Sequence, residues 1–291
     1  MSQAPSPAEL AALNAVSAKR QRSLLDVFGD AFAQTFQSPV VFLDNEQLQS
    51  PVSVRFYRKD FAYLSKQLYL EYQYRSWRGF NAETLERYNE VITKKLVNIN
   101  ILMTNTINRL EKLLQQNGVT LESSLFPNPQ NLTVPVIAAH ARSYFQILRD
   151  LDRVNLLAGT ANLLGVIDSV QRSQAEFLCK KAVRAFRSIL QTEVSKLYRE
   201  ADRIVKEQAA GGAVNEAMSA IVAEQGKEIA AFAASANEGA DADHSLDLGN
   251  VDAAKLIDDA AAASLAATAA TKGGRKKAAA AAATATETPA A

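Results

Sequence analysis

The segment from Asn81 to Asn117 contains neither proline nor glycine, and apolar residues recur along it at steps of three and four. This spacing places the apolar side chains on one side of an α-helix. A repeat with about 3.67 residues per turn keeps them on that side with almost no supercoiling. The pattern therefore predicts one helix of about 55 Å, ended by Gly118. Its apolar stripe consists of Leu85, Tyr88, Ile92, Leu96, Ile99, Met103, Ile107, Leu110 and Leu114.

Apolar residues at helical spacing also occur in four other segments, so the fold is predicted to be mainly α with long amphipathic helices. These segments are 8–36, the helix that residues 58–60 open and that carries apolar residues to Tyr72, 137–157 and 170–207. Gly159 is expected to end the third of them. Three short segments of extended or alternating character predict a small β element beside the helices. They are 40–43, 52–57 and 132–137.

The charge is divided unevenly along the chain, although its total is only +1. Residues 51–207 carry 23 basic and 15 acidic side chains, a net charge of +8, and are predicted to form an α-rich folded core. Residues 1–50, at −2, are expected to form an N-terminal helix and a short extended segment. Residues 208–291, at −5, contain 32 alanines among 84 residues. Alanine buries little area, so this part is predicted to be a low-complexity, mostly disordered tail, in which helices over 214–236 or 251–270 lack a packing partner.

Residues 52–57 alternate between apolar and polar side chains, as in a strand with one buried face. The strand leads directly into an amphipathic helix, a turn and a second helix, which is the order of a ribbon-helix-helix DNA-binding module. In such a module the polar side of the strand reaches base edges in the major groove. The alternative is a strand of an ordinary small sheet that packs against helices. The predicted base-reading residues are Ser53, Arg55 and Tyr57, and the predicted phosphate contacts beside them are Arg58 and Lys59.

The outer side of the predicted helix 170–207 carries many cations, for which three interpretations are open. They are mixed with glutamates, so they can form a solvated face held by ion pairs one turn apart. They can also bind the phosphates of DNA, in which case Lys180, Arg184 and Arg187 are the predicted contacts. A membrane-surface role is least favoured, because no exposed side rich in Trp or Phe accompanies the basic one. The cations are Lys180, Lys181, Arg184, Arg187, Lys196, Arg199, Arg203 and Lys206.

The sequence contains no recognised catalytic, metal-binding or cofactor-binding motif. His140 has no Cys, Asp or Glu close to it in sequence, which favours a packed or surface histidine over a base or a metal ligand. Cys179 lies beside two lysines, but a small buried residue is favoured over a reactive thiol. The protein is therefore expected not to be an enzyme and to use no cofactor, metal or small-molecule substrate. A single cysteine, a polar amino terminus and the lack of a long apolar run predict a cytoplasmic protein without a membrane segment.

A series of short motifs follows the long helix between residues 96 and 190. They are Ser-Ser-Leu-Phe-Pro at 123–127, Leu-Thr-Val-Pro-Val-Ile at 132–137, His-Ala-Arg-Ser-Tyr at 140–144, Leu-x-x-Leu-Asp-x-Val at 148–154, Gly-Val-Ile at 165–167 and Lys-Ala-Val-Arg-Ala-Phe-Arg at 181–187. Over this third of the chain the sequence resembles the AcaB-like proteins encoded on integrating conjugative elements and conjugative plasmids. The resemblance implies transcriptional regulation by DNA binding in a bacterial cytoplasm. It does not extend to the aromatic-rich region 56–88 or to the alanine-rich tail.

Two functions are therefore open. The leading hypothesis is a DNA-binding transcriptional regulator or accessory protein of a bacterial mobile genetic element, acting on double-stranded DNA as a homodimer. The alternative is a non-enzymatic structural or adaptor protein that binds other proteins through its long helices. Phosphate binding predicts an affinity for DNA that falls steeply with salt, whereas the adaptor predicts no such binding.

Overall fold

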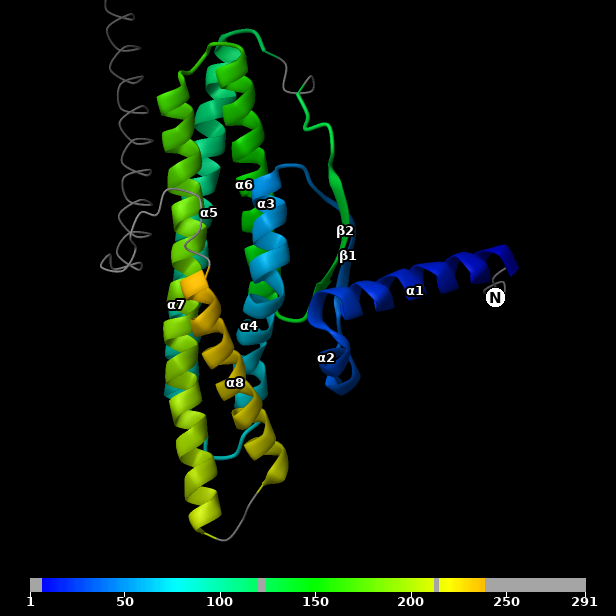
Figure 1. The fold of residues 1–291 in the computed structure, drawn as a ribbon, viewed down its shortest axis with the longest axis vertical. Coiled ribbons are helices and arrows are strands. Elements are labelled where there is room, and N and C mark those ends of the chain that lie inside the picture. Colours follow the sequence, from blue (N-terminus) through cyan, green and yellow to red (C-terminus); the bar gives the residue numbers. More distant parts are fainter. Residues whose placement is uncertain (1–6, 120–123, 212–214, 239–291) are drawn as a thin grey trace, which may run out of the picture.

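The computed structural model describes residues 7–119, 124–211 and 215–238, and this part of the chain is mainly helical with one two-stranded sheet (Figure 1). Its N-terminal part contains α1 (Pro7–Phe28), α2 (Asp30–Thr35) and β1 (Val41–Leu48). A continuous helical segment follows, made of α3 (Pro51–Phe56), the π-helical turn η1 (Tyr57–Phe61) and α4 (Ala62–Arg75). The remaining elements are α5 (Ala82–Gln116), β2 (Gln130–Val136), α6 (Ala139–Leu163), α7 (Ser169–Ala210) and α8 (Glu216–Glu238). The predicted class, mainly α with long helices and a small β element, is confirmed.

Helices α5, α6 and α7 run side by side and form the body of the molecule (Figure 1). Every residue of the predicted α5 stripe is buried, and Ile92, Ile99 and Met103 are fully enclosed. Between α6 and α7, the ring of Tyr144 stacks on the ring of Phe186, with 5.7 Å between their centroids. Within the described residues, no helix combines the length and the apolar character that crossing a membrane requires.

The ends of the long helices follow from local signals in the sequence. The Asn81 side chain accepts a hydrogen bond from the amide of Glu83 at 2.9 Å and caps α5, and Gly118 follows its end with a φ of 71°. The prediction that Gly159 ends the next helix is wrong, because α6 continues to Leu163. The neighbouring Ala158 is fully buried, and packing of this face offsets the cost of about 1 kcal/mol for a glycine inside a helix.

Strands β1 and β2 form an antiparallel pair that runs from Val41 opposite Val136 to Leu48 opposite Gln130. The predicted extended segments 40–43 and 132–137 are therefore confirmed. The sheet also holds α1: Arg20 forms an ion pair with Asp44 of β1, and the Ser23 hydroxyl donates to the backbone carbonyl of Thr133 in β2. Figure 1 shows α1 crossing the sheet, with its C-terminal end beside α4, where Phe28 packs in a cluster with Tyr69.

The predicted strand at 52–57 is wrong, because these residues belong to a helix that begins at Pro51. The Ser50 hydroxyl accepts a hydrogen bond from the Ser53 amide at 3.2 Å, and proline in the first turn needs no N–H partner. The carboxylate of Asp152 in α6 holds the entry to the helix by accepting from the Ser50 amide at 2.6 Å. An alternation over six residues cannot outweigh a capped helix start that is also anchored to α6.

Residues 216–238 differ from the predicted unpacked tail, because α8 turns back along α7 (Figure 1). Met218 and Val222, one turn apart, are buried, and the Tyr74 hydroxyl of α4 donates to the side chain of Gln225. The expectation that a helix near 214–236 lacks a packing partner is therefore wrong, since its few large apolar residues fall on one face. The prediction of disorder for the rest of the tail concerns residues 239–291, which lie outside the described residues.

Candidate functional site

The α3–η1 segment, residues 51–61, separates basic side chains from apolar ones. The rings of Tyr57 and Phe61 stack at 5.0 Å, and each meets the ring of Phe145 in α6 edge-on. This packing fixes the apolar side of the segment against the body. A π-helical turn widens the helix by one residue and is frequent at functional sites. The segment's exposed residues include the three cations Arg55, Arg58 and Lys59.

A buried ion pair links this segment to α7. Nη1 of Arg187 lies 2.6 Å from Oδ1 of Asp60, a residue that is only 4% exposed. Burial raises the pKa of the Asp60 carboxyl, and the positive charges of Arg187, Lys59, Arg184 and Arg55 act against this rise. Cations from two elements that are distant in sequence are thus within electrostatic reach of one carboxylate.

We call these four cations, together with the neighbouring Arg58, the basic surface. Arg55, Arg58 and Lys59 of α3–η1 line a hollow of about 420 Å³ together with Pro51 and Val54. The two arginines of α7 complete the group. Guanidinium groups bind phosphate through two parallel hydrogen bonds, and a lysine adds a compact charge, so the arrangement suits a phosphate-rich ligand. The basic surface consists of Arg55, Arg58, Lys59, Arg184 and Arg187.

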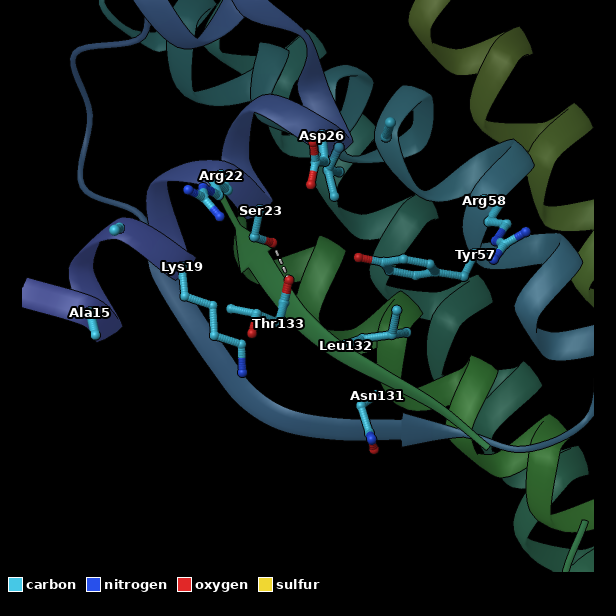
Figure 2. Close-up of a pocket in the computed structure, with 13 residues that line it drawn as sticks. Ala15, Lys19, Arg22, Ser23, Asp26, Tyr57, Arg58, Asn131, Leu132 and Thr133 are labelled. Carbon is cyan, nitrogen blue, oxygen red and sulfur yellow. Dashed lines mark hydrogen bonds between the residues drawn. The ribbon is translucent and has the colours of Figure 1, made fainter. Parts of the chain in front are cut away.

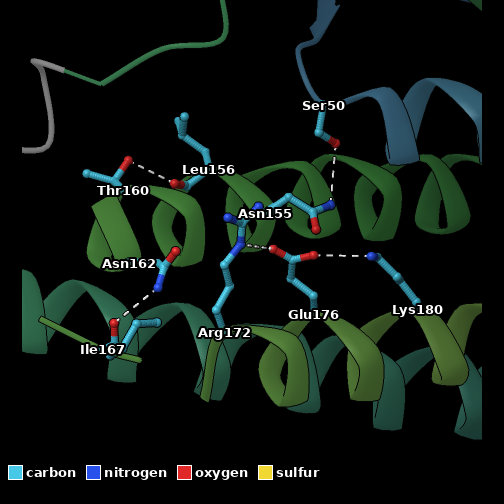
Figure 3. A network of polar contacts seen from close by, with 9 residues as sticks. All are labelled: Ser50, Asn155, Leu156, Thr160, Asn162, Ile167, Arg172, Glu176 and Lys180. Carbon is cyan, nitrogen blue, oxygen red and sulfur yellow. Dashed lines mark hydrogen bonds and ion pairs between the residues drawn. The ribbon is translucent and has the colours of Figure 1, made fainter. Parts of the chain in front are cut away.

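Five of the eight predicted DNA-contact residues belong to the basic surface, and Ser53, Tyr57 and Lys180 do not. Ser53 and Tyr57 are 0% and 8% exposed, so the prediction that they point outward from a strand is wrong. They are buried because α3 turns them towards α6 instead of presenting one side of a strand. Lys180 forms an ion pair with Glu176 at 3.1 Å, and Glu176 also accepts from Arg172 at 2.8 Å (Figure 3).

The C-terminal third of α7 also carries several cations, and Lys196, Arg203 and Lys206 pair with carboxylates of the same helix. Lys196 contacts Glu193 at 2.6 Å, and Arg203 contacts both Glu200 and Glu207 at 2.6 Å. The solvated face held by ion pairs, one of the interpretations open from the sequence, is confirmed in this part of the helix. We call it the ion-paired face, made of Glu193, Lys196, Glu200, Asp202, Arg203, Lys206 and Glu207.

A larger hollow, the α1 groove, lies where α1, η1 and β2 meet (Figure 2). Its volume is about 730 Å³. Sequence reasoning missed it, because its walls come from three separate segments and no local pattern links them. The only hint is that two cations one turn apart on α1 share the groove with a cation of η1. The polar side chains that line it include Lys19, Arg22, Asp26, Tyr57, Arg58 and Thr133.

The two residues considered for catalysis have structural contacts. Cys179 is fully buried, its Sγ lies 4.0 Å from Oγ1 of Thr106, and burial raises the pKa of its thiol to about 12. The interpretation as a buried structural cysteine is confirmed. His140 has its Nε2 at 3.0 Å from Oγ1 of Thr93, and burial lowers its pKa. It is a packed histidine at the contact between α5 and α6.

Neither models of protein families nor curated proteins give a match to this sequence. Among solved structures, the fold is similar to that of AcaB from uropathogenic E. coli, with a TM-score of 0.53 and 17% sequence identity. The similarity covers 60% of this chain and 88% of AcaB. The partial resemblance to AcaB that the sequence indicates is thereby confirmed at the level of the fold.

Proposed function

We propose that this protein is a DNA-binding transcriptional regulator of a bacterial mobile genetic element, and that its basic surface contacts the backbone of double-stranded DNA in the cytoplasm. One observation carries the proposal: a single buried carboxylate, that of Asp60, lies within electrostatic reach of four cations from two distant segments, Arg55, Lys59, Arg184 and Arg187. The AcaB-like fold and the sequence resemblance to that family support the regulatory part.

The exposed cations of the α3–η1 segment, Arg55, Arg58 and Lys59, are well placed to bind phosphate. Even when Asp60 is ionised, the cations of the basic surface outnumber this one negative charge, so the surface keeps a positive potential that attracts DNA. Neutralising phosphates also releases counterions condensed on DNA. We assign phosphate contacts to Arg55, Arg58, Lys59 and Arg184, and a positioning role to Arg187, which binds Asp60. Phosphate contacts set affinity and register more than sequence preference.

The salt dependence of duplex binding by the full chain tests the proposal. Fluorescence anisotropy between about 50 and 200 mM salt should give an association constant whose logarithm falls linearly with log salt. The slope should be about −3 to −4 for four phosphate contacts, at −0.9 for each. A triple variant, Arg55→Gln, Arg58→Gln and Lys59→Gln, should make this slope shallower by nearly three.

A matched control removes three cations from the ion-paired face through Lys196→Gln, Arg203→Gln and Lys206→Gln. It changes the net charge by the same amount, but its cations are already paired with carboxylates, so the slope should stay close to that of the parent. Equal losses in both triple variants would mean that total charge alone governs binding. A parent chain that does not bind duplex at the lowest salt would refute the proposal.

A second candidate function, self-association or protein binding, is favoured by apolar residues exposed near the turn from α6 to α7. Leu163 is 86% exposed, Leu164 54%, Val170 60% and Leu178 48%. Neighbouring exposed apolar side chains are typical of interaction sites. The expected homodimer cannot use a ribbon at 52–57, since that segment is helical, so we assign dimer formation to this apolar tip.

Sedimentation equilibrium tests the assignment. The parent chain should have the mass of a dimer, and the variant Leu163→Ser with Val170→Ser should shift towards the monomer without a change in helix content. A control pair, Thr104→Ser with Asn108→Ser on exposed positions of α5, should leave the dimer intact. A monomeric parent chain would reject the dimer, and an unchanged dimer in the variant would reject the apolar tip.

A further inference from the structure

We propose that the α1 groove binds a small amphipathic anion, a molecule with an apolar body and one carboxylate group. This inference goes beyond DNA binding and does not depend on it. It rests on the size and lining of the groove, on a buried hydroxyl without a partner, and on the charges at its rim.

The size and the lining of the groove fit a small molecule. Its volume of about 730 Å³ lies inside the range of about 300–1,000 Å³ that is usual for such sites. Ala18 of α1, Ala62 of α4 and Leu132 of β2 contribute to its walls. Alanines in these positions leave space that larger side chains would fill, and the apolar walls favour an apolar ligand body.

Thr133 provides an independent sign of a ligand. It lines the groove, it is only 9% exposed, and its hydroxyl has no hydrogen-bond partner. Buried polar groups in native proteins are nearly always hydrogen-bonded, so an orphaned one calls for a partner that completes the site. The nearby Ser23 hydroxyl donates to the Thr133 carbonyl, and no hydrogen bond joins it to the Thr133 hydroxyl. Figure 2 shows the hydroxyl of Tyr57 also pointing into the groove.

The charged side chains indicate the sign of the ligand. Lys19 and Arg22 of α1 and Arg58 of η1 contribute three positive charges to the lining, and Asp26 contributes one negative charge. The excess is small, which suits the single charge of a carboxylate. A carboxylate also accepts hydrogen bonds from guanidinium and hydroxyl groups together, which matches the Arg22, Thr133 and Tyr57 side chains.

Arg58 connects the groove to the proposed DNA site. It lines both the α1 groove and the hollow of the basic surface. An anion that engages Arg58 from the groove withdraws a charge from the surface that would meet DNA. Ligand and DNA should therefore weaken each other's binding, and this coupling is reciprocal by thermodynamic linkage.

Isothermal titration calorimetry of the full chain with octanoate tests the inference. Octanoate should bind at a single site, and octan-1-ol, which has the same apolar body without the charge, should bind at least about tenfold more weakly. Acetate, which has the charge without the body, should give no heat of binding. If octan-1-ol or acetate binds as well as octanoate, the amphipathic site is overturned, and so it is if octanoate does not bind.

Variants locate the site. Arg22→Gln should weaken octanoate binding about tenfold through loss of a charge-assisted hydrogen bond, and the isosteric Thr133→Val about fivefold. Thr133→Val should at the same time leave the melting temperature unchanged or raise it, because the substitution removes an unpaired buried hydroxyl. If the hydroxyl had a purely structural role, the substitution would lower the melting temperature. Ala18→Phe should fill the groove and abolish binding. The control Arg109→Gln, at an exposed position on α5, should bind octanoate like the parent.

Binding that survives both Arg22→Gln and Ala18→Phe would place octanoate elsewhere and overturn the inference. Saturating octanoate should also lower the affinity of the parent for duplex DNA. Calorimetry is performed without DNA, so a failure of DNA binding leaves the ligand result intact, and the two proposals can fail separately.

Discussion

The α3–η1 segment and the C-terminal third of α7 both present several cations, but they differ in where the opposing carboxylates lie. On the ion-paired face each carboxylate is one helical turn from its cation, at 2.6 or 2.7 Å, and both partners reach solvent. On α3–η1 the nearby carboxylate is Asp60, which is buried and bound by Arg187 from another helix.

This difference shows that the number of cations on a surface does not decide what the surface binds. A cation with an exposed carboxylate one turn away has a local partner, and the pair contributes little to stability or to long-range attraction. Exposed cations beside one buried carboxylate, here Arg55 and Lys59, keep most of their charge for an external anion. The same Lys and Arg content therefore yields a solvated face in one place and a candidate binding surface in the other.

Breaking one arginine–carboxylate pair in each region should give the largest contrast. Arg187→Ala leaves Asp60 buried without its cation, which should lower the free energy of unfolding by about 3 kcal/mol, the low end for a broken buried pair, since Arg187 keeps some contact with solvent. Arg203→Ala removes an exposed partner and should leave stability within experimental error of the parent. Urea unfolding followed by circular dichroism measures both.

The double variant Asp60→Asn with Arg187→Ala separates the charge from the packing. Removing both charges should restore part of the stability lost in Arg187→Ala alone, because no uncompensated charge stays buried. No recovery in the double variant would indicate that Arg187 acts through packing of its aliphatic part.

The capping residues of α3 and α7 should also differ in how much stability is lost when each is replaced by alanine. Ser50, the cap of α3, is 1% exposed and bonds to the Ser53 amide and hydroxyl, so Ser50→Ala should cost roughly 2 kcal/mol of stability. Asp168 caps α7 at an exposed position, and Asp168→Ala should cost about 1 kcal/mol. Thermal unfolding of both variants gives the order, and a larger cost for Asp168→Ala would contradict the importance of burial at α3.

The ion-paired face can be converted into a surface with unmatched charge. Glu200→Gln with Glu207→Gln leaves Arg203 without its two carboxylates, so the affinity for duplex DNA should rise several-fold and the salt slope should steepen by about 0.9. Glu83→Gln with Glu86→Gln, at exposed positions of α5, is the control for the change in net charge. An equal rise in the control would mean that net charge decides affinity, not its local pairing.

The smallest difference lies in the pKa values of the two acids. Hydrogen bonds from Arg203 hold the pKa of Glu200 below its ordinary value of 4.5, whereas burial raises the pKa of Asp60 above 3.8. Carboxyl chemical shifts measured during an NMR titration should show these two pKa shifts in opposite directions. In Arg203→Gln the pKa of Glu200 should return upward, and that of Asp60 should not change.

Long periodic segments of the fold are predictable from the sequence, and short ones depend on context. The stripe in α5 spans many turns, so no other structure buries all of its residues. Residues 52–57 fit a strand and a helix almost equally, and Ser50, Pro51 and the distant Asp152 decide between them. The prediction that Gly159 ends a helix is wrong for the same reason, because the burial of its neighbours depends on tertiary packing that the local sequence does not show.

The candidate site is predictable in its residues but not in its arrangement. Arg55, Arg58 and Lys59 stand out in the sequence as cations, yet their meeting with Arg184 and Arg187 depends on how α3–η1 packs against α6 and α7. The α1 groove has no sequence signal of its own, because a wall made by three segments exists only in the fold. Composition likewise indicates an alanine-rich tail, but not that Met218 and Val222 find a partner.

The two-stranded sheet has a consequence for how the molecule assembles and opens. Gln47 and Asn131, hydrogen-bonded across the strands, are 84 residues apart, so the sheet closes a loop that contains α3, α4 and α5. Such distant contacts form after local helices during folding. The N-terminal arm, made of α1, α2 and β1, is joined to β2 through the sheet and Ser23. It should therefore dock late and detach first, with β1 amides exchanging hydrogen faster than those of α5. A molecule bound in the α1 groove would act as a clamp that keeps the arm docked.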